Sequence, residues 1–99
     1  SMTAPNAGTA EELGRTLVSE RLAACANVVP NIVSMYWWEG ELQRDDEAMV
    51  ILKTVRQRAE ALEARAVELH PYSVPEVLVL AVSGGHAPYL DWVGNEVGG

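Results

Sequence analysis

The side chains with the most varied chemistry lie close together in the stretch 69–76. His70 offers an imidazole, Tyr72 a phenol and Glu76 a carboxylate, on a backbone stiffened by two prolines. A histidine at the end of a helix meets free carbonyls that favour imidazolium, whereas metal binding requires the neutral ring. We therefore expect His70 to be a charge switch or a metal ligand. The structural alternative is a histidine bonded to carbonyls or to a neighbouring carboxylate.

Cys25, the single cysteine, is the second candidate metal ligand. Free cysteines are often buried, so its alternative is a packing role. A closed soft-metal site needs several thiolate or imidazole ligands, and one cysteine with two histidines cannot build one in a single chain. Three chains could pool their ligands, or Met2 could act as a soft thioether ligand. No recognisable motif pairs a nucleophile with a base and no glycine-rich phosphate loop occurs, so we do not expect an enzyme.

Two adjacent aromatic residues and a basic one add to the candidate binding side chains. Trp37 and Trp38 are neighbours on a predicted strand, so their side chains point to opposite faces. We expect one in the core or in a subunit interface, while the other can wall a pocket. Lys53 is a possible ionic partner of Glu76, as is His70, and an ion pair of this kind has a purely structural reading as well.

Length and composition indicate one globular domain spanning residues 1–99. The formal net charge is -7 with only 7 Lys and Arg, which argues against nucleic acid as a partner. No apolar run approaches the roughly 20 residues that cross a bilayer, and no signal peptide opens the chain, so we expect no membrane partner and a cytoplasmic location. A single cysteine agrees with a reducing compartment.

Helical periodicity appears in three places. Thr9, with the capping-box spacing to Glu12, predicts a helix that ends near Ala23 or Ala24. A second amphipathic helix is predicted over residues 56–69, and a short third one begins at Pro88, a residue that the first turn accepts.

Between these helices the residues favour strands. We predict a long strand over 26–38 that bends at Pro30, since proline cannot donate to a sheet ladder. Residues 39–47 are polar and predict the tip of a hairpin, and residues 48–52 return as a strand covered on both faces. Another strand is predicted over 77–82.

The order of these elements lacks one strand of a split β-α-β sandwich, in which a strand precedes the first helix. Only residues 2–5 are available for it. Either that strand is a stub, or part of the natural chain is absent.

Six short motifs occur in order along the chain and together resemble one protein family. They are Thr3-Ala4-Pro5; Glu20-Arg21-Leu22-Ala23-Ala24-Cys25; Ser34 and Tyr36 with Trp38 and Gly40; Lys53-Thr54; His70-Pro71-Tyr72 with Pro75-Glu76; and Tyr89-Leu90 with Trp92. The family is CutA, the divalent-cation tolerance proteins. The resemblance implies an α+β, ferredoxin-like split β-α-β sandwich with a long central hairpin, here with a truncated first strand. It also implies a homotrimer.

For function, the resemblance implies a role in tolerance to divalent metal ions. Copper or another divalent ion is the cofactor it suggests, bound weakly or between subunits. His70 is the one ligand that the resemblance carries over, and Cys25 is the second candidate from the residues alone. In relatives with proposed copper sites, a cysteine precedes Thr-Ala-Pro and two histidines precede the proline, whereas this chain has Met2 and Leu69-His70. The alternative function is a trimeric small-ligand sensor or scaffold. In either case the expected binding residues are Tyr36, Trp38, Lys53, Tyr72 and Glu76.

Overall fold

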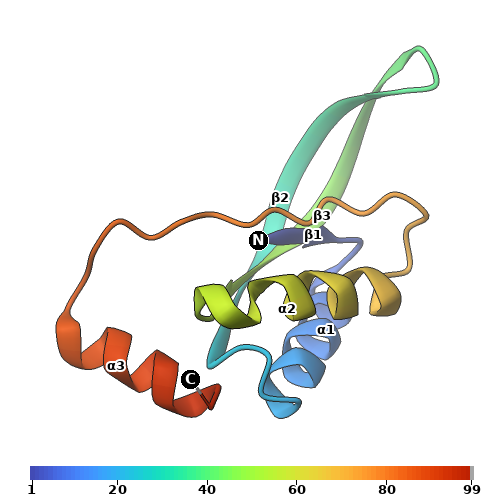
Figure 1. The fold of residues 1–99 in the computed structure, drawn as a ribbon. Helices are drawn as coiled ribbons and strands as arrows, with labels where there is room; N and C mark the ends of the chain where they lie inside the picture. Colours follow the sequence, from blue (N-terminus) through green and yellow to red (C-terminus); the bar gives the residue numbers. More distant parts are fainter. Residues whose placement is uncertain (99) are drawn as a thin grey trace.

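The computed structural model describes residues 1–98, in which a three-stranded antiparallel sheet packs against helices in an α+β fold. The elements are β1 (Met2–Ala4), α1 (Ala7–Ser19), β2 (Cys25–Trp38), β3 (Glu41–Lys53), α2 (Arg56–Leu69) and α3 (Ala87–Glu96). The strand order is β1-β3-β2, and the β2–β3 hairpin projects well beyond the helices (Figure 1). The predicted α+β fold, with its long central hairpin and short first strand, is confirmed.

The hairpin is paired over almost its entire length, from Cys25 opposite Lys53 to Trp38 opposite Glu41. Glu39 and Gly40 have φ of 50° and 80° and form a two-residue turn of the kind that suits twisted hairpins. The predicted polar tip over 39–47 was therefore wrong, because residues 41–47 are strand. Polar residues are tolerated in this ladder because no helix covers it. A register shift between Val29 and Ile32 confirms the predicted bend at Pro30.

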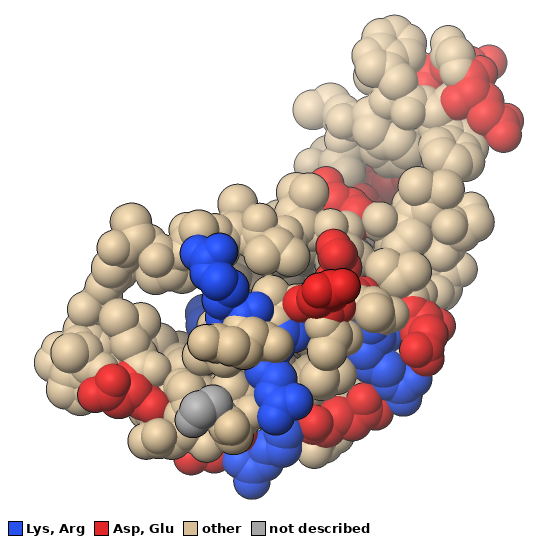
Figure 2. All heavy atoms as spheres, viewed as in Figure 1, with Lys and Arg blue, Asp and Glu red and all other residues tan. Residues whose placement is uncertain are grey.

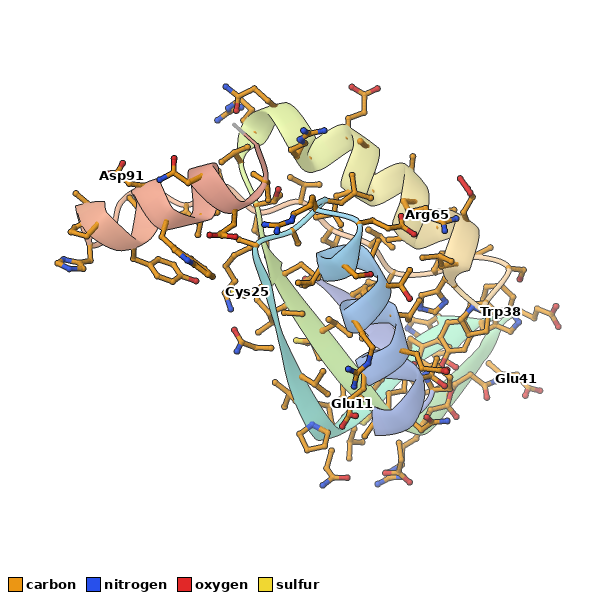
Figure 3. The ribbon with its side chains drawn as sticks, turned by 90° about the horizontal axis from the view of Figure 1, so that it is seen from below. Glu11, Cys25, Trp38, Glu41, Arg65 and Asp91 are labelled. Atoms are coloured by element: carbon orange, nitrogen blue, oxygen red, sulfur yellow. The ribbon has the colours of Figure 1, made fainter. Side chains whose placement is uncertain are left out.

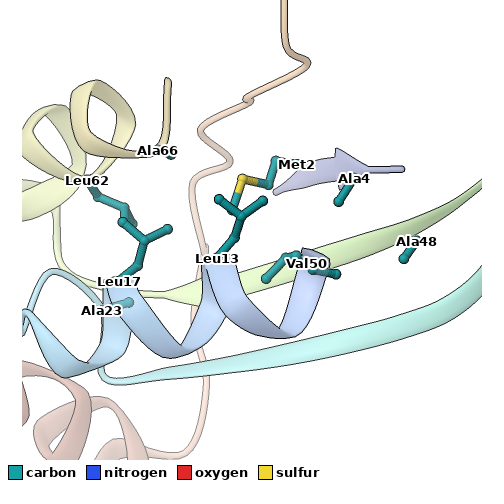
Figure 4. Packing of buried hydrophobic residues seen from close by; sticks show 10 residues of the cluster. Met2, Ala4, Leu13, Leu17, Ala23, Ala48, Val50, Leu62 and Ala66 are labelled. Atoms are coloured by element: carbon teal, nitrogen blue, oxygen red, sulfur yellow. The ribbon is translucent and has the colours of Figure 1, made fainter. Parts of the chain in front are cut away.

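The core lies between one face of the sheet and helices α1 and α2. Figure 4 shows Met2 and Leu13 pointing toward each other above Val50, with Leu17 facing Leu62. On β3, Val50 is fully buried while Ile51 is exposed. The prediction that residues 48–52 are covered on both faces was wrong, because the helices occupy one side of the sheet only.

Both ends of α1 differ from the sequence prediction. The helix cap is Asn6, whose side-chain oxygen accepts from the Thr9 N–H at 2.8 Å, so Thr9 lies inside the helix. The helix ends at Ser19 because Arg21 takes a φ of 63°, a left-handed value that breaks the helix before Ala24. By contrast, α2 has the predicted bounds, and α3 carries its proline in the first turn as predicted.

Residues 77–82, predicted as a strand, run outside the sheet in an extended path that leads to α3 (Figure 1). Their only ladder contacts in the described chain are a bridge from Val77 to Met2 and hydrogen bonds between Leu78 and Ser1. Since β1 is three residues long, the pairing stops there. Leu78, Leu80 and Val82 are 54%, 70% and 74% exposed. The strand prediction was wrong for the single chain.

Candidate functional site

A groove lies between the hairpin and the segment that follows α2, and it encloses about 580 Å³. We call it the hairpin groove. Its charged and aromatic lining consists of three carboxylates and three aromatic side chains. They are Asp45, Glu47 and Glu76, and Tyr36, Trp38 and Tyr72. The lining contains no Lys, Arg or His. In Figure 2, acidic side chains also lie at the tip of the hairpin, while most Lys and Arg side chains lie over the helical layer.

Strand periodicity places four of these side chains. Tyr36 and Trp38 are two residues apart on β2 and share a face, as do Asp45 and Glu47 on β3. The antiparallel register brings the two strands together with Ser34 opposite Asp45. The opposite wall comes from residues 72–76, which the prolines hold in an extended turn rather than in a continued helix.

Tyrosine hydroxyls bond two of the carboxylates. The Tyr72 hydroxyl donates to Glu47 Oε2 at 2.7 Å, and the Tyr36 hydroxyl donates to the Asp45 carboxylate. Burial and the neighbouring Glu47 carboxylate raise the pKa of Tyr72, and the hydrogen bond to Asp45 together with burial raises the pKa of Tyr36. Both phenols therefore remain protonated donors at neutral pH, and the ionisable oxygens of the groove belong to its carboxylates.

His70 lies next to the groove and is 7% exposed. Its Nε2 is 2.7 Å from the carbonyl oxygen of Thr3, and its Nδ1 accepts from the Tyr72 N–H at 3.1 Å. This bonding pattern places the ring proton on Nε2 of a neutral imidazole. The ring thus ties β1 to the turn after α2, as in the structural alternative. To bind a metal ion, His70 would have to release one of these two backbone groups.

Cys25 and Lys53 lie away from the hairpin groove. Cys25 Sγ is 3.4 Å from the Tyr89 hydroxyl, and Lys53 hydrogen-bonds the side chain of Asn27. Figure 3 shows Cys25 beside α3 and Trp38 at the far end of the hairpin. One chain therefore does not bring Cys25 and His70 together. Across residues 1–98, no three His, Cys, Asp or Glu side chains are grouped in a way that could hold a metal ion.

Sequence reasoning missed Asp45 and Glu47 as groove residues, because it assigned them to the hairpin tip. Their two-residue spacing is a strand signal that was present but weak in a polar stretch. Of the expected binding residues, the structure gathers Tyr36, Trp38, Tyr72 and Glu76 in one groove. It places Lys53 in a second, apolar groove, away from Glu76.

Comparison with known proteins places the chain in context. Residues 1–96 match the family described as "CutA1 divalent ion tolerance protein". The chain is 40% identical over 97 residues to the divalent-cation tolerance protein CutA of Thermus thermophilus, covering 98% of this chain and 94% of that protein. It is 44% identical over 94 residues to the chloroplastic CutA 1 protein of Oryza sativa, covering 95% of this chain and 53% of the relative. The chain thus spans about half the length of that plant relative.

Solved structures agree with this similarity. The crystal structure of CutA from Xylella fastidiosa superposes with a TM-score of 0.94 at 38% identity, covering 97% of this chain and 92% of that one. A structure of the "PII-like protein CutA" from Nostoc, in its apo form, superposes with a TM-score of 0.90 at 34% identity, with coverage of 97% and 92%.

The names of the relatives include information on cellular compartment and on activity. The rice relative is chloroplastic and an Archaeoglobus fulgidus relative is titled periplasmic, so a cytoplasmic location for this chain stays a prediction. In residues 1–98, none of the helices has the length and apolar character that crossing a bilayer requires. The family is described by tolerance to divalent ions and not by a catalysed reaction, in agreement with the expectation of a non-enzyme. The match over residues 1–96, the identity to relatives and the shared fold together show that the chain belongs to the CutA1 divalent ion tolerance protein family.

Proposed function

We propose that this chain acts in tolerance to divalent metal ions as a homotrimer, with weak cation binding at the hairpin groove near a junction between subunits. The observation that carries the trimer is the extended apolar segment 77–82. Its side chains are more than half exposed at Leu78, Leu80 and Val82. Most of its backbone hydrogen-bonding groups have no ladder partner in the described chain.

A second chain can provide the ladder partner that segment 77–82 lacks in the described chain. Unpaired strand groups and exposed apolar side chains favour pairing with another edge. Strand β2 is an edge strand in the order β1-β3-β2, so its outer side is free to accept a further strand. Segment 77–82 of one subunit on β2 of the next is a head-to-tail contact, which gives a closed ring when the rotation between subunits closes. The number three follows from the family resemblance.

The second groove supports the same assembly. It is lined mainly by apolar side chains of β3, α2, α3 and segment 77–82, and it encloses about 460 Å³. Ile51 and Leu80 contribute exposed apolar surface to it. Burial of such apolar surface between subunits favours association.

The charge of the hairpin groove favours cation binding. Three carboxylates line the hairpin groove without a basic residue, so it attracts copper or another divalent ion and repels anions. Because His70 and Cys25 lie apart in one chain, they can share an ion only when ligands from different subunits are pooled. This is why we propose weak, intersubunit binding.

Mass in solution tests the trimer. Light scattering should give three times the chain mass of 10.7 kDa. Leu80→Glu places a charge in the proposed interface and should lower the mass, whereas Glu63→Gln on α2 should leave it unchanged. A monomeric mass for the unmodified protein would overturn the proposal.

Calorimetric titration with Cu(II) and Zn(II) tests the metal. We expect weak binding of the metal ion to the unmodified protein. Binding should decrease in each of three variants, Glu76→Gln, His70→Ala and Cys25→Ser. Light scattering and circular dichroism on each variant establish that it remains folded and assembled. Equal metal binding by the unmodified protein and by His70→Ala would show that His70 is not a ligand. If the unmodified protein binds neither Cu(II) nor Zn(II), the proposed metal binding is wrong.

A second candidate function is small-ligand sensing by the same trimer. The hairpin groove favours it because its volume, about 580 Å³, falls within the usual range for small-molecule sites. The Nostoc protein with the same fold is titled PII-like, which supports this alternative by analogy of fold only. If neither metal binds, a thermal-shift screen of small charged ligands would test it.

A further inference from the structure

We propose that the hairpin groove binds a small organic ammonium ion, in preference to a bare metal ion. The ammonium ion would bind in the same groove as in the proposed function, and its binding does not depend on metal binding. It names the class of ligand from the shape, charge and aromatic character of the lining.

The charge of the groove selects a cation. Asp45, Glu47 and Glu76 line it, and no Lys, Arg or His does. Glu47 is 8% exposed, and one of its oxygens accepts from Tyr72. A carboxylate has about four lone-pair sites, so Asp45 and Glu47 keep acceptor capacity after each has taken one hydroxyl. An N–H donor can use the remaining sites.

The aromatic walls favour an organic cation. Tyr36 and Trp38 stand side by side on β2, and Tyr72 contributes from the opposite wall. In the single chain the three side chains are 39%, 48% and 37% exposed, so part of each ring surface lines the groove. Ammonium groups bind over aromatic faces, with tryptophan the strongest, and aromatic residues that surround a cation are a known means of recognising quaternary ammonium compounds.

A bare divalent ion matches the groove less well. Calcium and magnesium need six or more oxygens converging within about 2.6 Å, and copper and zinc prefer imidazole or thiolate. In the described chain, no three carboxylate, imidazole or thiolate groups converge. The space of about 580 Å³ is large for one ion and suitable for a small molecule. A cation that spreads its charge over several carbon atoms fills that space and touches both walls.

Isothermal titration calorimetry on the intact protein tests the proposal, with pairs of ligands in which one compound is charged and the other is its neutral analogue. The probes are choline against its uncharged carbon analogue dimethylbutanol, and putrescine against butanediol. At least one charged probe should bind about tenfold more tightly than its neutral partner, because the neutral compound keeps the shape but loses the attraction to rings and carboxylates.

Variants then locate the site. Trp38→Leu and Glu76→Gln should each weaken binding of the charged probe by about fivefold or more. Trp37→Leu and Asp46→Asn remove the same groups from the opposite faces of β2 and β3, and they should change affinity by less than about twofold, as neither residue lines the groove. Circular dichroism and light scattering confirm that each variant keeps its fold and mass.

The outcomes separate this inference from the proposed function. Equal binding of charged and neutral probes, no binding of either charged probe, or equal losses in the groove and control variants would overturn the ammonium site. A trimeric mass with Cu(II) or Zn(II) binding would leave the proposed function standing in that case. Ammonium binding with the expected variant pattern and no metal binding would support this inference and overturn the metal part of the proposed function.

Discussion

Replacement of His70 by alanine should destabilise the fold, whatever the protein binds. The ring is buried and connects two backbone groups that are far apart in sequence, the carbonyl of Thr3 and the N–H of Tyr72. His70→Ala removes both hydrogen bonds and leaves two backbone groups without their partner. At about 1 kcal/mol for each hydrogen bond, and a further contribution from the lost packing of the ring, we expect a loss of about 3 kcal/mol.

Two conservative variants separate the bonds. Asparagine can place its oxygen near the position of Nδ1 and keep the bond from the Tyr72 N–H, whereas glutamine can place its N–H₂ near Nε2 and keep the bond to Thr3. His70→Asn and His70→Gln should each recover part of the stability lost in His70→Ala. His86→Ala serves as the control, because His86 is exposed and its side chain makes no cap hydrogen bond.

Urea unfolding followed by circular dichroism, at one fixed protein concentration, measures these differences. A ligand role alone would leave the stability of the metal-free protein unchanged in all four variants. If His70→Ala unfolds at the same urea concentration as the unmodified protein, the connecting role is refuted. If all three His70 variants lose equal stability, packing of the ring and not its hydrogen bonds is responsible.

Three further predictions concern local structure. Asn6→Ala removes the cap of α1 and should lower the unfolding free energy by about 1 kcal/mol, while Asn6→Asp should retain most of it, as urea unfolding would show. Gly40→Val should cost about 1–2 kcal/mol in the same assay, because the φ of 80° disfavours a side chain although no atom lies within 4 Å of an added Cβ. Burial and the Glu47 carboxylate raise the pKa of Tyr72 in the folded protein above its value in the unfolded chain. The hydrogen bond from Tyr72 to Glu47 therefore contributes its full stability below about pH 10, and this contribution is lost as the pH rises through the pKa of the folded protein. Stability should therefore fall more steeply above about pH 10 in the unmodified protein than in Tyr72→Phe, and equal slopes in the two pH series would refute this.

Local patterns in the sequence were enough to predict several elements. The bounds of α2 followed from its apolar periodicity and from the proline after His70, since the residue before a proline disfavours the helical conformation. The bend of β2 at Pro30 and the proline in the first turn of α3 followed from the missing N–H of proline in the same way. Each of these signals acts within a few residues, so no knowledge of distant contacts was needed.

The candidate site was predicted in part. Tyr36, Trp38, Tyr72 and Glu76 were expected to bind, and they line one groove. Asp45 and Glu47 were missed because a polar run resembles a loop until a partner strand is known to lie beside it. The hydrogen bond from Tyr72 to Glu47 joins residues 25 positions apart, and the bond from His70 to Thr3 spans 67 positions. Such contacts depend on strand register and burial, which no local pattern specifies.

Segment 77–82 shows most clearly the difference between what local sequence predicts and what tertiary contacts decide. Its apolar, β-branched residues indicated a strand, and the backbone is indeed extended there, but an extended chain becomes a strand only when a partner completes its ladder. In the single chain, β1 provides one bridge, at Met2 opposite Val77. Local sequence thus determined that the three helices form, the bounds of α2, the bend of β2 and the residue types of the groove. The tertiary structure decided which side chains meet, how His70 is bonded and which strand edges stay free, because these depend on the lengths and register of elements distant in the chain.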